Sequence, residues 1–313
     1  AKPGLVALKE VAGIMGNVDA RSVGFGLGPR LNAAGRLGKA DSGLHLLTAT
    51  DLGTAKTLAN ELEKTNQERK EIQEETFLEA ESLLRNERDL ESERVIVLAS
   101  ELFHPGVIGI AGSKIVDTYH RPTVLIALEE GIGKGSGRSI PKFNLFKAFT
   151  NCSSHLIQFG GHAYAAGLSI AEENVDAFRD AMNEVGHQFL TDEDLIPEIK
   201  LDTTLDLSQI NFPFYKSIAL LEPFGAENPV PSFQSQGVKI KEVKHMGKEK
   251  NHLRFRAVQG SGQIGVIAFN FASLFESLDI TNEFFDIAYE LHLNSWNGRE
   301  KLELRLLDIR ASE

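Results

Sequence analysis

Three short glycine-rich segments carry the residues of this chain that could do chemistry: GGHAYAAG at 160–167, GSGRS at 135–139 and GPRLNAAGR at 28–36. Glycine lets the backbone adopt positive φ and lets a ligand approach the main chain closely. Histidine and arginine beside such a backbone can donate hydrogen bonds, and the guanidinium fork matches two oxygens of one anion. Together the three segments predict a site for a phosphate group.

Two sets of side chains could contact this anion. The GSGRS segment predicts a glycine-flanked turn in which Ser136, Arg138 and Ser139 offer hydroxyl groups and a guanidinium, with an exposed hairpin turn as the alternative. His104 stands between a predicted strand and a predicted helix, and ligands gather at the carboxyl ends of strands in α/β sheets. A surface histidine that caps the helix is the alternative for His104.

The GPRLNAAGR segment presents two arginines and an asparagine. Asn32 and Arg36 share one face if these residues are helical, because positions four apart are neighbours on a helix. Arg30, Asn32 and Arg36 are therefore candidate phosphate ligands, and a helix-cap network is the alternative interpretation.

Residues 44–91 contain no proline, and Gly53 is their only glycine. A narrow apolar stripe among dense charges predicts one long polar helix, or two helices, with a solvated charged face. Asp41 or Ser42 could cap the start, since both side chains accept backbone N–H groups. A helix exposed over most of its circumference commonly bridges domains, so we expect a connecting helix over 42–93.

Residues 94–192 alternate between predicted strands and predicted helices. Apolar runs predict buried strands at 94–100 and 121–130, and a third strand is expected near the turn at 131–139. Beyond the Gly-Gly-His loop, the strand AAGLSI follows at 165–170. Helical patterns lie at 104–120, 142–158 and 174–190. This alternation predicts an α/β domain.

From about Pro197 the pattern changes to short alternating segments separated by Gly and Asn turns. Spacing of this kind is typical of an antiparallel barrel. Five or more such strands fit a small barrel such as an OB-fold. We therefore expect an all-β OB-fold over 193–313.

The chain has a formal net charge of −11, yet a basic stretch lies in the expected barrel. Seven Lys and Arg residues stand against two Glu residues there, an excess of five positive charges, which predicts a nucleic-acid-binding face. Trp296 could stack on a base, with core packing as the alternative. The basic residues are Lys239, Lys241, Lys244, Lys248, Lys250, Arg254 and Arg256.

Several function classes are disfavoured by what the sequence lacks. Cys152 is the single cysteine, so it forms no internal disulfide and no thiolate metal site, and we expect it to be a small buried side chain. The sequence has no Asp-His-His, no P-loop and no dinucleotide fingerprint. We expect a chain that holds phosphate without the usual means of cleaving it, and no metal ligand.

The expected location of the protein follows from its apolar runs and its amino-terminal stretch. No apolar run approaches the length of a membrane span, and the amino-terminal stretch lacks the apolar core of a secretory signal. We therefore expect a cytoplasmic protein that does not contact a membrane.

Five motifs resemble the later motifs of RecJ-type single-strand-specific exonucleases, which belong to the DHH phosphoesterase superfamily. The resemblance follows the family's order from about Gly4 to the carboxyl terminus. GGHAYAAG alone is shared with other members of the superfamily and with a domain of alanyl-tRNA synthetases, whereas LEPFGAENP followed by a barrel is specific to the RecJ type. The motifs are GPRLNAAGR, HPGVIGIAGSKI, GSGRS, GGHAYAAG and LEPFGAENPVP.

The resemblance implies a 5′→3′ exonuclease on single-stranded DNA, used in repair and recombination. In that family a DHH domain holds Mn²⁺ or Mg²⁺, a long helix leads to a DHH-associated α/β domain, and an OB-fold follows. The metal-binding motifs have no matching positions here, so the resemblance implies a carboxyl-terminal portion that is inactive alone and has no cofactor of its own. The implied divisions are the end of the DHH domain at 1–41, the connecting helix at 42–93, the DHH-associated domain at 94–192 and the OB-fold at 193–313.

By similarity, a set of side chains would face the metal centre and grip the scissile phosphate. His162, Arg138 and His104 would act in catalysis, and the amides of Gly160 and Gly161 would form a nest for the anion. Arg36 and Ser136 would hold the strand end. The implied partners are single-stranded DNA and a single-strand-binding protein or a helicase, and the chain is expected to be a monomer.

Two alternatives stay open. One is a stand-alone module that binds single-stranded nucleic acid. The other is a relative of oligoribonucleases or cyclic-dinucleotide phosphodiesterases, which the expected terminal barrel disfavours.

Overall fold

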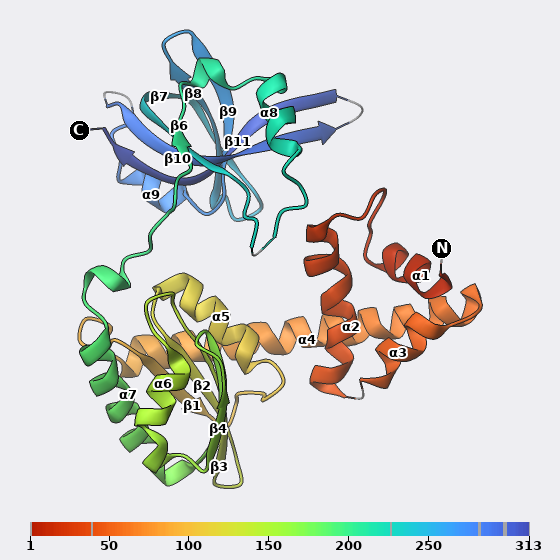
Figure 1. Cartoon of the computed structure of the whole chain (residues 1–313), viewed down its shortest axis with the longest axis vertical. Coiled ribbons are helices and arrows are strands. Elements are labelled where there is room, and N and C mark those ends of the chain that lie inside the picture. Colours follow the sequence, from red (N-terminus) through yellow and green to blue (C-terminus); the bar gives the residue numbers. More distant parts are fainter. Residues whose placement is uncertain (1, 39, 226, 281–282, 297–298, 313) are drawn as a thin grey trace. The chain divides into compact units, whose positions relative to one another are not determined.

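The computed structural model describes residues 2–38, 40–225, 227–280, 283–296 and 299–312 (Figure 1). The chain forms two compact units, Ala1–Pro197 and Glu198–Glu313. The first contains an amino-terminal group of helices and an α/β domain, and the second is a β-barrel.

The amino-terminal helices α1 (Pro3–Val11), α2 (Gly28–Leu37) and α3 (Asp41–Thr48) pack on the first half of α4 (Leu52–Glu87). Their shared core is made of small and medium apolar residues, which lets the helices approach closely. A π-helical segment, η1 (Ser22–Leu27), leads directly into α2. The core residues are Ala7, Leu8, Leu27, Ala34, Leu46, Ala55, Ala59 and Leu62.

The segment expected as one connecting helix over 42–93 contains two helices, which was the second interpretation of its pattern. Helix α3 ends at Thr48, and α4 begins at Leu52. The side chain of Asp51 accepts a hydrogen bond from Thr54 N at 2.8 Å and so caps α4. The expectation that Asp41 or Ser42 caps a helix is wrong, because α3 has no side-chain cap.

The α/β domain is a five-stranded sheet in the order β1-β2-β3-β5-β4. Strands β1 and β2 are parallel and the other neighbours are antiparallel. Helices α4 and α5 cover one face, and α6 and α7 cover the other, each over its own apolar core (Figure 1). The bounds are β1 (Ile96–Ser100), α5 (Ile108–Tyr119), β2 (Thr123–Glu129), β3 (Ile132–Arg138), α6 (Leu145–Asn151), β4 (Gln158–Gly161), β5 (Ala165–Ala171) and α7 (Val175–Phe189).

The GSGR residues lie in a central strand and not in a turn, so that expectation is wrong. Gly133, Gly135 and Gly137 alternate along β3 on one face of the sheet. A Cβ atom at Gly135 would stand 2.6 Å from Leu168 Cδ1, and one at Gly137 would stand 2.5 Å from Leu145 Cδ2. These glycines are therefore required by close packing. The residues between them, including Ser136, face α5.

Two further local expectations are also corrected. The helix expected over 142–158 is limited to α6, followed by a 3-10 turn at Ser153–His155. Gly160 and Gly161 belong to the edge strand β4, where they pair with Gly167 and Ala166. Because successive amides of an extended strand point to opposite sides, these two amides do not form a nest.

The second unit is a closed five-stranded barrel, in which β10 pairs with both β11 and β7. Apolar residues alternate inward along each strand and fill the interior, as the sequence predicted. The expected OB-fold is confirmed. Its elements are β6 (Thr203–Thr204), α8 (Phe212–Ala219), β7 (Ser232–Met246), β8 (His252–Gln259), β9 (Gly262–Ala268), α9 (Ala272–Glu276), β10 (Phe285–Trp296) and β11 (Arg299–Ala311).

Candidate functional site

The first candidate site is centred on Arg138 at the end of β3. Its Nη1 donates to Ser136 Oγ at 3.0 Å and to Gly137 O at 2.7 Å, so the side chain folds back along its own strand. Above it, a Cβ atom at Gly109 would stand 2.5 Å from Arg138 Nη2 and 3.0 Å from Ser136 Oγ. The start of α5 therefore lies directly over the guanidinium because Gly109 has no side chain.

The loop between β1 and α5 carries His104, and its Gly106 contacts both His104 and Arg36. His104 Nδ1 accepts a hydrogen bond from Gly106 N at 3.0 Å, which fixes the ring on the loop. Arg36 of α2 donates through Nη1 to Gly106 O at 3.2 Å. A side chain at Gly106 would collide with the backbone carbonyl of Arg36. The contact thus joins the helical group to the α/β domain.

A third arginine, Arg69, lies in the middle of α4, and the sequence analysis missed it. Seven buried positions of α4 and the half-buried Gln73 follow each other at alternating steps of four and three, which defines one seam of the helix. The seam is apolar toward both ends and polar between them. Its residues are Ala55, Ala59, Leu62, Asn66, Arg69, Gln73, Thr76 and Ala80.

Arg69 is held rigidly within this seam. It donates to Gln73 Oε1 at 2.6 Å and to Asn66 Oδ1 at 2.7 Å. The Nδ2 atom of Asn66 is buried and has no hydrogen-bond partner among the described residues. A polar stripe along an otherwise apolar seam is the signal by which Arg69 could have been found.

The three arginines share one electrostatic neighbourhood. Burial lowers the pKa of Arg138, and the positive charge of Arg36 lowers it further. The same two causes, in the same order, lower the pKa of Arg69. In the described part of the chain no carboxylate forms an ion pair with Arg36, Arg69 or Arg138. Close positive charges without a counter-charge are what an anion-binding site needs.

Two of the expected phosphate ligands are occupied elsewhere. Arg30 forms an ion pair with Glu63 and donates to Gly26 O at 2.7 Å, so its guanidinium holds the helical group together. Ser139 Oγ donates to Phe143 O at 2.7 Å and closes the turn before α6. These contacts do not favour a phosphate role for Arg30 or Ser139. Asn32 is exposed on α2, one turn before Arg36.

His162 lies in the turn between β4 and β5. Its backbone N donates to Ala165 O at 2.8 Å, and the turn is also fixed by Ser139 N, which donates to Tyr164 O at 3.1 Å. Arg138 pairs with Ala165 in the sheet, so the turn lies at the same end of the sheet as the end of β3. Among the described residues no hydrogen bond or ion pair joins the His162 ring to the arginines, and its role stays a prediction.

The second candidate site is on the barrel. Lys241 pairs with Arg256 and Lys244 with Arg254 across β7 and β8, so the expected basic stretch forms one outer face of this hairpin. Two of its cations have carboxylate partners: Arg256 with Glu242 at 3.0 Å, and Arg254 with the buried Glu303. The outer face is therefore less basic than its sequence suggests.

The remaining expected barrel residues are spread around this hairpin. Lys239 lies over the Phe284 ring, 4.7 Å from its centroid. Lys248 and Lys250 stand exposed between β7 and β8. The side chain of Trp296 lies outside the part of the chain that the structure describes.

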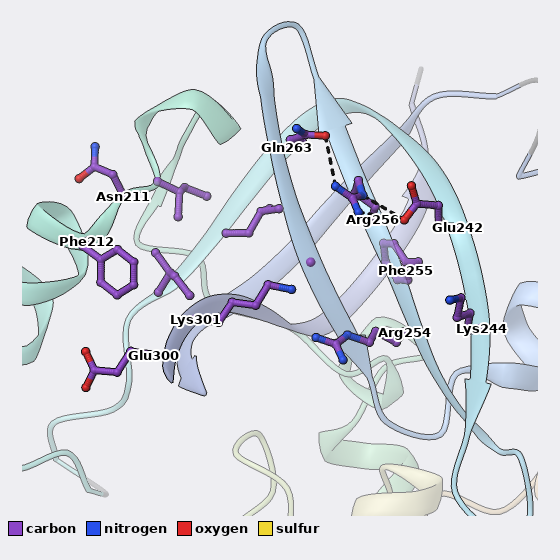
Figure 2. A pocket seen from close by; sticks show the side chains of 14 residues that line it. Asn211, Phe212, Glu242, Lys244, Arg254, Phe255, Arg256, Gln263, Glu300 and Lys301 are labelled. Atoms are coloured by element: carbon purple, nitrogen blue, oxygen red, sulfur yellow. Dashed lines mark hydrogen bonds and ion pairs between the residues drawn. The ribbon is translucent and has the colours of Figure 1, made fainter. Parts of the chain in front are cut away.

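A cavity of about 680 Å³ opens on the outer face of the barrel (Figure 2). Lys301 of β11, which the sequence analysis did not single out, reaches into it together with Arg254. Phe212 contributes an aromatic wall to the cavity and is 40% exposed.

Neither metal clusters nor membrane spans were found in the described residues. In those residues no three or more His, Cys, Asp and Glu side chains gather in a way that could hold a metal ion. None of the described helices combines the length and apolar character that crossing a membrane requires.

Two domain families match this chain. Residues 92–187 match the family described as the DHHA1 domain, and residues 201–308 match the RecJ OB domain. The Single-stranded-DNA-specific exonuclease RecJ of Bacillus subtilis (strain 168) is 35% identical over 308 residues, covering 98% of this chain and 39% of that relative.

Solved structures agree with the sequence relatives. The crystal structure of RecJ from Thermus thermophilus in complex with Mn²⁺ has a TM-score of 0.84 at 32% identity, and covers 100% of this chain and 44% of that chain. The complex of the same RecJ with Mg²⁺ has a TM-score of 0.83 and is covered to 47%. The chain thus spans less than half the length of these relatives, and the predicted fold, a DHH-associated domain with an OB-fold, is confirmed.

Proposed function

Because this chain belongs to the RecJ family, we propose that it is part of a single-stranded-DNA-specific exonuclease that works 5′→3′ in DNA repair and recombination. Its contribution is to grip the phosphates of the strand. The two domains would do this at different places: the arginine cluster of the α/β domain at the reacting end, and the barrel farther along the strand.

The observation that carries this proposal is a group of three guanidiniums in which the charge of Arg36 acts on both Arg69 and Arg138. Arg36, Arg69 and Arg138 lie near one another without a carboxylate partner in the described residues, although the chain as a whole is acidic. A phosphate oxygen pair would supply the missing negative charge through charge-assisted hydrogen bonds. Ser136 adds a hydroxyl group beside Arg138, and His104 adds an imidazole on the loop whose Gly106 contacts Arg36.

The divalent cation would come from another part of the enzyme. RecJ of Thermus thermophilus was crystallised with Mn²⁺ and with Mg²⁺, and the described residues of this chain include no metal-binding cluster. When bound, such a cation supplies charge stabilisation and an activated water. The residues of this chain would hold the phosphate in place, and the chain alone would not cleave DNA.

The barrel supports the choice of single-stranded DNA as the partner. OB-folds bind single strands through basic grooves and aromatic side chains, and this barrel carries both. We also propose that the protein is cytoplasmic and monomeric, and that it works with a single-strand-binding protein or a helicase.

A binding experiment tests the proposal. A fluorescent oligodeoxythymidine with a 5′-phosphate is titrated with the chain and with Arg138→Ala, and the affinity is expected to fall about tenfold, as for a hydrogen bond to a charged group. Arg85→Ala is the matched control, because Arg85 is exposed near the end of α4, where it pairs with Glu81. Equal affinities of Arg138→Ala and the unmodified chain would remove the cluster from the site.

A nuclease assay tests the proposal that the chain alone does not cleave DNA. The pure chain is incubated with single-stranded DNA and Mn²⁺, and no digestion is expected. Robust Mn²⁺-dependent digestion that disappears in Arg138→Ala would contradict the proposed division of the active site between two parts of the enzyme.

A further inference from the structure

The pocket on the barrel is arranged around one buried carboxylate, Glu303 of β11. Its side chain is 0% exposed, although Lys301 and Arg305 on the same side of the strand are exposed. Three side chains cover it: Arg254, which forms an ion pair with Oε1, Lys301 at 3.2 Å from Oε1, and Asn294, whose Nδ2 donates to Oε2 at 3.1 Å. The carboxylate is thus enclosed by donors from three strands.

Glu303 is negatively charged at neutral pH. Burial raises its pKa, but the hydrogen bonds from Asn294 and Lys301 and the charge of Arg254 outweigh burial, so the pKa lies below its usual value. A buried carboxylate with two cations on one oxygen fixes the directions of both cations. Figure 2 shows the ends of Arg254 and Lys301 close together at the centre of the pocket.

Both cations keep donors for a ligand. The Arg254 side chain is 42% exposed and the Lys301 side chain 60% exposed. Arg254 has five N–H groups and Lys301 has three. In the described residues both side chains contact Glu303 Oε1, which uses only part of these donors. A Cβ atom at Gly265 would contact Lys301 Nζ at 3.4 Å and Glu303 Oε1 at 3.6 Å, so the missing side chain leaves the space beside both groups open.

The other walls suit a nucleotide. Four cations and two carboxylates line the pocket, and with the carboxylate of Glu303 the net charge is plus one. Ile210, Ile264 and Leu302 add apolar surface, and Phe212 offers an exposed ring on which a base can stack. The volume of about 680 Å³ lies within the usual range for small-ligand sites.

We propose that this pocket binds one nucleotide of a single strand, with its phosphate on Lys301 and Arg254 and its base beside Phe212, and that Glu303 is the positioning residue for both cations. The inference rests on the proposed function, because it takes single-stranded DNA as the ligand of the barrel. It adds where one phosphate binds, and that Glu303 orients the two cations that bind it.

The position of the acidic residues favours a nucleotide over an acidic peptide. Glu300 and Glu242 stand on opposite sides of the pocket, with Lys301 and Arg254 between them (Figure 2). A run of several carboxylates would meet one of these glutamates on either side. A single phosphate between them contacts only the cations.

The test compares Glu303→Gln and Lys301→Ala with the unmodified chain. Binding of a fluorescent oligodeoxythymidine is measured by anisotropy across a series of salt concentrations. Lys301→Ala is expected to weaken binding about fivefold and to reduce the salt dependence by about one phosphate contact. Glu303→Gln is also expected to weaken binding, although it makes the chain more positive, because both cations lose their fixed positions.

A matched pair on the same two strands provides the control. Arg305 of β11 pairs with Glu290 of β10 at 3.5 Å outside the pocket. Glu290→Gln removes the same charge as Glu303→Gln but leaves Lys301 and Arg254 in place, so its binding should be unchanged or slightly tighter. Arg305→Ala should weaken binding less than Lys301→Ala. Thermal unfolding of each variant checks that the barrel is folded.

The outcomes separate the inference from the proposed function. Tighter binding by Glu303→Gln, or unchanged affinity and salt dependence of Lys301→Ala, would overturn the inference alone. The same holds if the variants lose affinity for an acidic peptide and not for the oligonucleotide. Failure of the unmodified chain to bind the oligonucleotide at all would contradict the proposed function and this inference together.

Discussion

Gly109 at the start of α5 and Arg138 at the end of β3 are packed so closely that a Cβ atom at Gly109 would lie 2.5 Å from Arg138 Nη2. The guanidinium is therefore confined between the helix and its own strand, where it contacts Ser136. The absence of a side chain at Gly109 thus determines where the charged group of Arg138 lies, although Arg138 comes 29 residues later in the sequence.

This relationship predicts that Gly109→Ala impairs binding without unfolding the domain. The added methyl group meets the end of a flexible side chain, so Arg138 moves at small cost, and alanine itself favours the helix. The affinity for a 5′-phosphorylated oligonucleotide should fall several-fold, while the midpoint of thermal unfolding stays within a few degrees. Gly112→Ala is the control, because its Cβ atom would make only ordinary contacts of 3.8–3.9 Å. A similar loss of affinity in both variants would argue against a displacement of Arg138.

The glycines on the opposite face of β3 predict an effect on stability instead. In Gly137→Ala the Cβ atom would stand 2.5 Å from Leu145 Cδ2 and 3.3 Å from Phe149 Cζ, and both of these side chains are fully buried. Overpacking of this kind costs about 1–3 kcal/mol, which urea unfolding measures directly. Gly160→Ala is the control, since nothing lies within 4 Å of its Cβ position. Equal stability of the two variants would show that the sheet and α6 can move apart.

In β3 the glycine pattern of the sequence predicted a turn where the protein has a strand. Glycine in a polar segment usually indicates a turn, because it permits positive φ. Gly133, Gly135 and Gly137 have another cause, which is contact with side chains from the neighbouring elements β2, β5 and α6. The pattern of a single sequence shows that a residue is small. It does not show which neighbouring side chain leaves no room for a larger one.

The barrel was easier to predict, because each strand separates a core from solvent. In β8, Leu253, Phe255 and Ala257 point inward while Arg254 and Arg256 point outward. This alternation is local and can be read from the sequence alone. The partners of the outward residues cannot, since Glu242 and Glu303 reach the two arginines through tertiary structure.

Arg69 represents an intermediate case. It stands in a run of charges that predicts a solvated face, yet it is 8% exposed because α1, α2, α3 and α5 surround α4. The spacing of Leu62, Asn66 and Arg69 places it on the buried seam. The identification of Arg36 and Arg138 came from motifs, whereas Arg69 could have been found only from its spacing along the seam.

The thiol of Cys152 is predicted to be unreactive in the folded protein. Burial raises its pKa to about 11, so almost no thiolate exists at neutral pH, and the side chain is 1% exposed. Incubation with iodoacetamide at pH 8 should leave the folded chain unmodified, as mass spectrometry can show. The same reagent should modify Cys152 fully in concentrated urea, which serves as the control. Rapid modification without urea would indicate that the core beside α6 opens readily.

The buried carboxylate of the barrel predicts how stability depends on pH. The folded-state pKa of Glu303 lies below its usual value, whereas the unfolded chain titrates near the ordinary glutamate value of about 4.3. Its contribution to the free energy of unfolding is therefore fully present above that pH and is lost as the pH falls through the folded-state pKa. Glu303→Gln cannot titrate, so it should be less stable than the unmodified chain at pH 7, and the difference should shrink as the pH decreases below about 4.3. Urea unfolding at a series of pH values measures this difference, with Glu290→Gln as the variant whose difference from the unmodified chain should stay small throughout. A difference for Glu303→Gln that is constant from pH 7 to pH 3 would mean that the carboxylate is not stabilised in its charged form by Arg254 and Lys301.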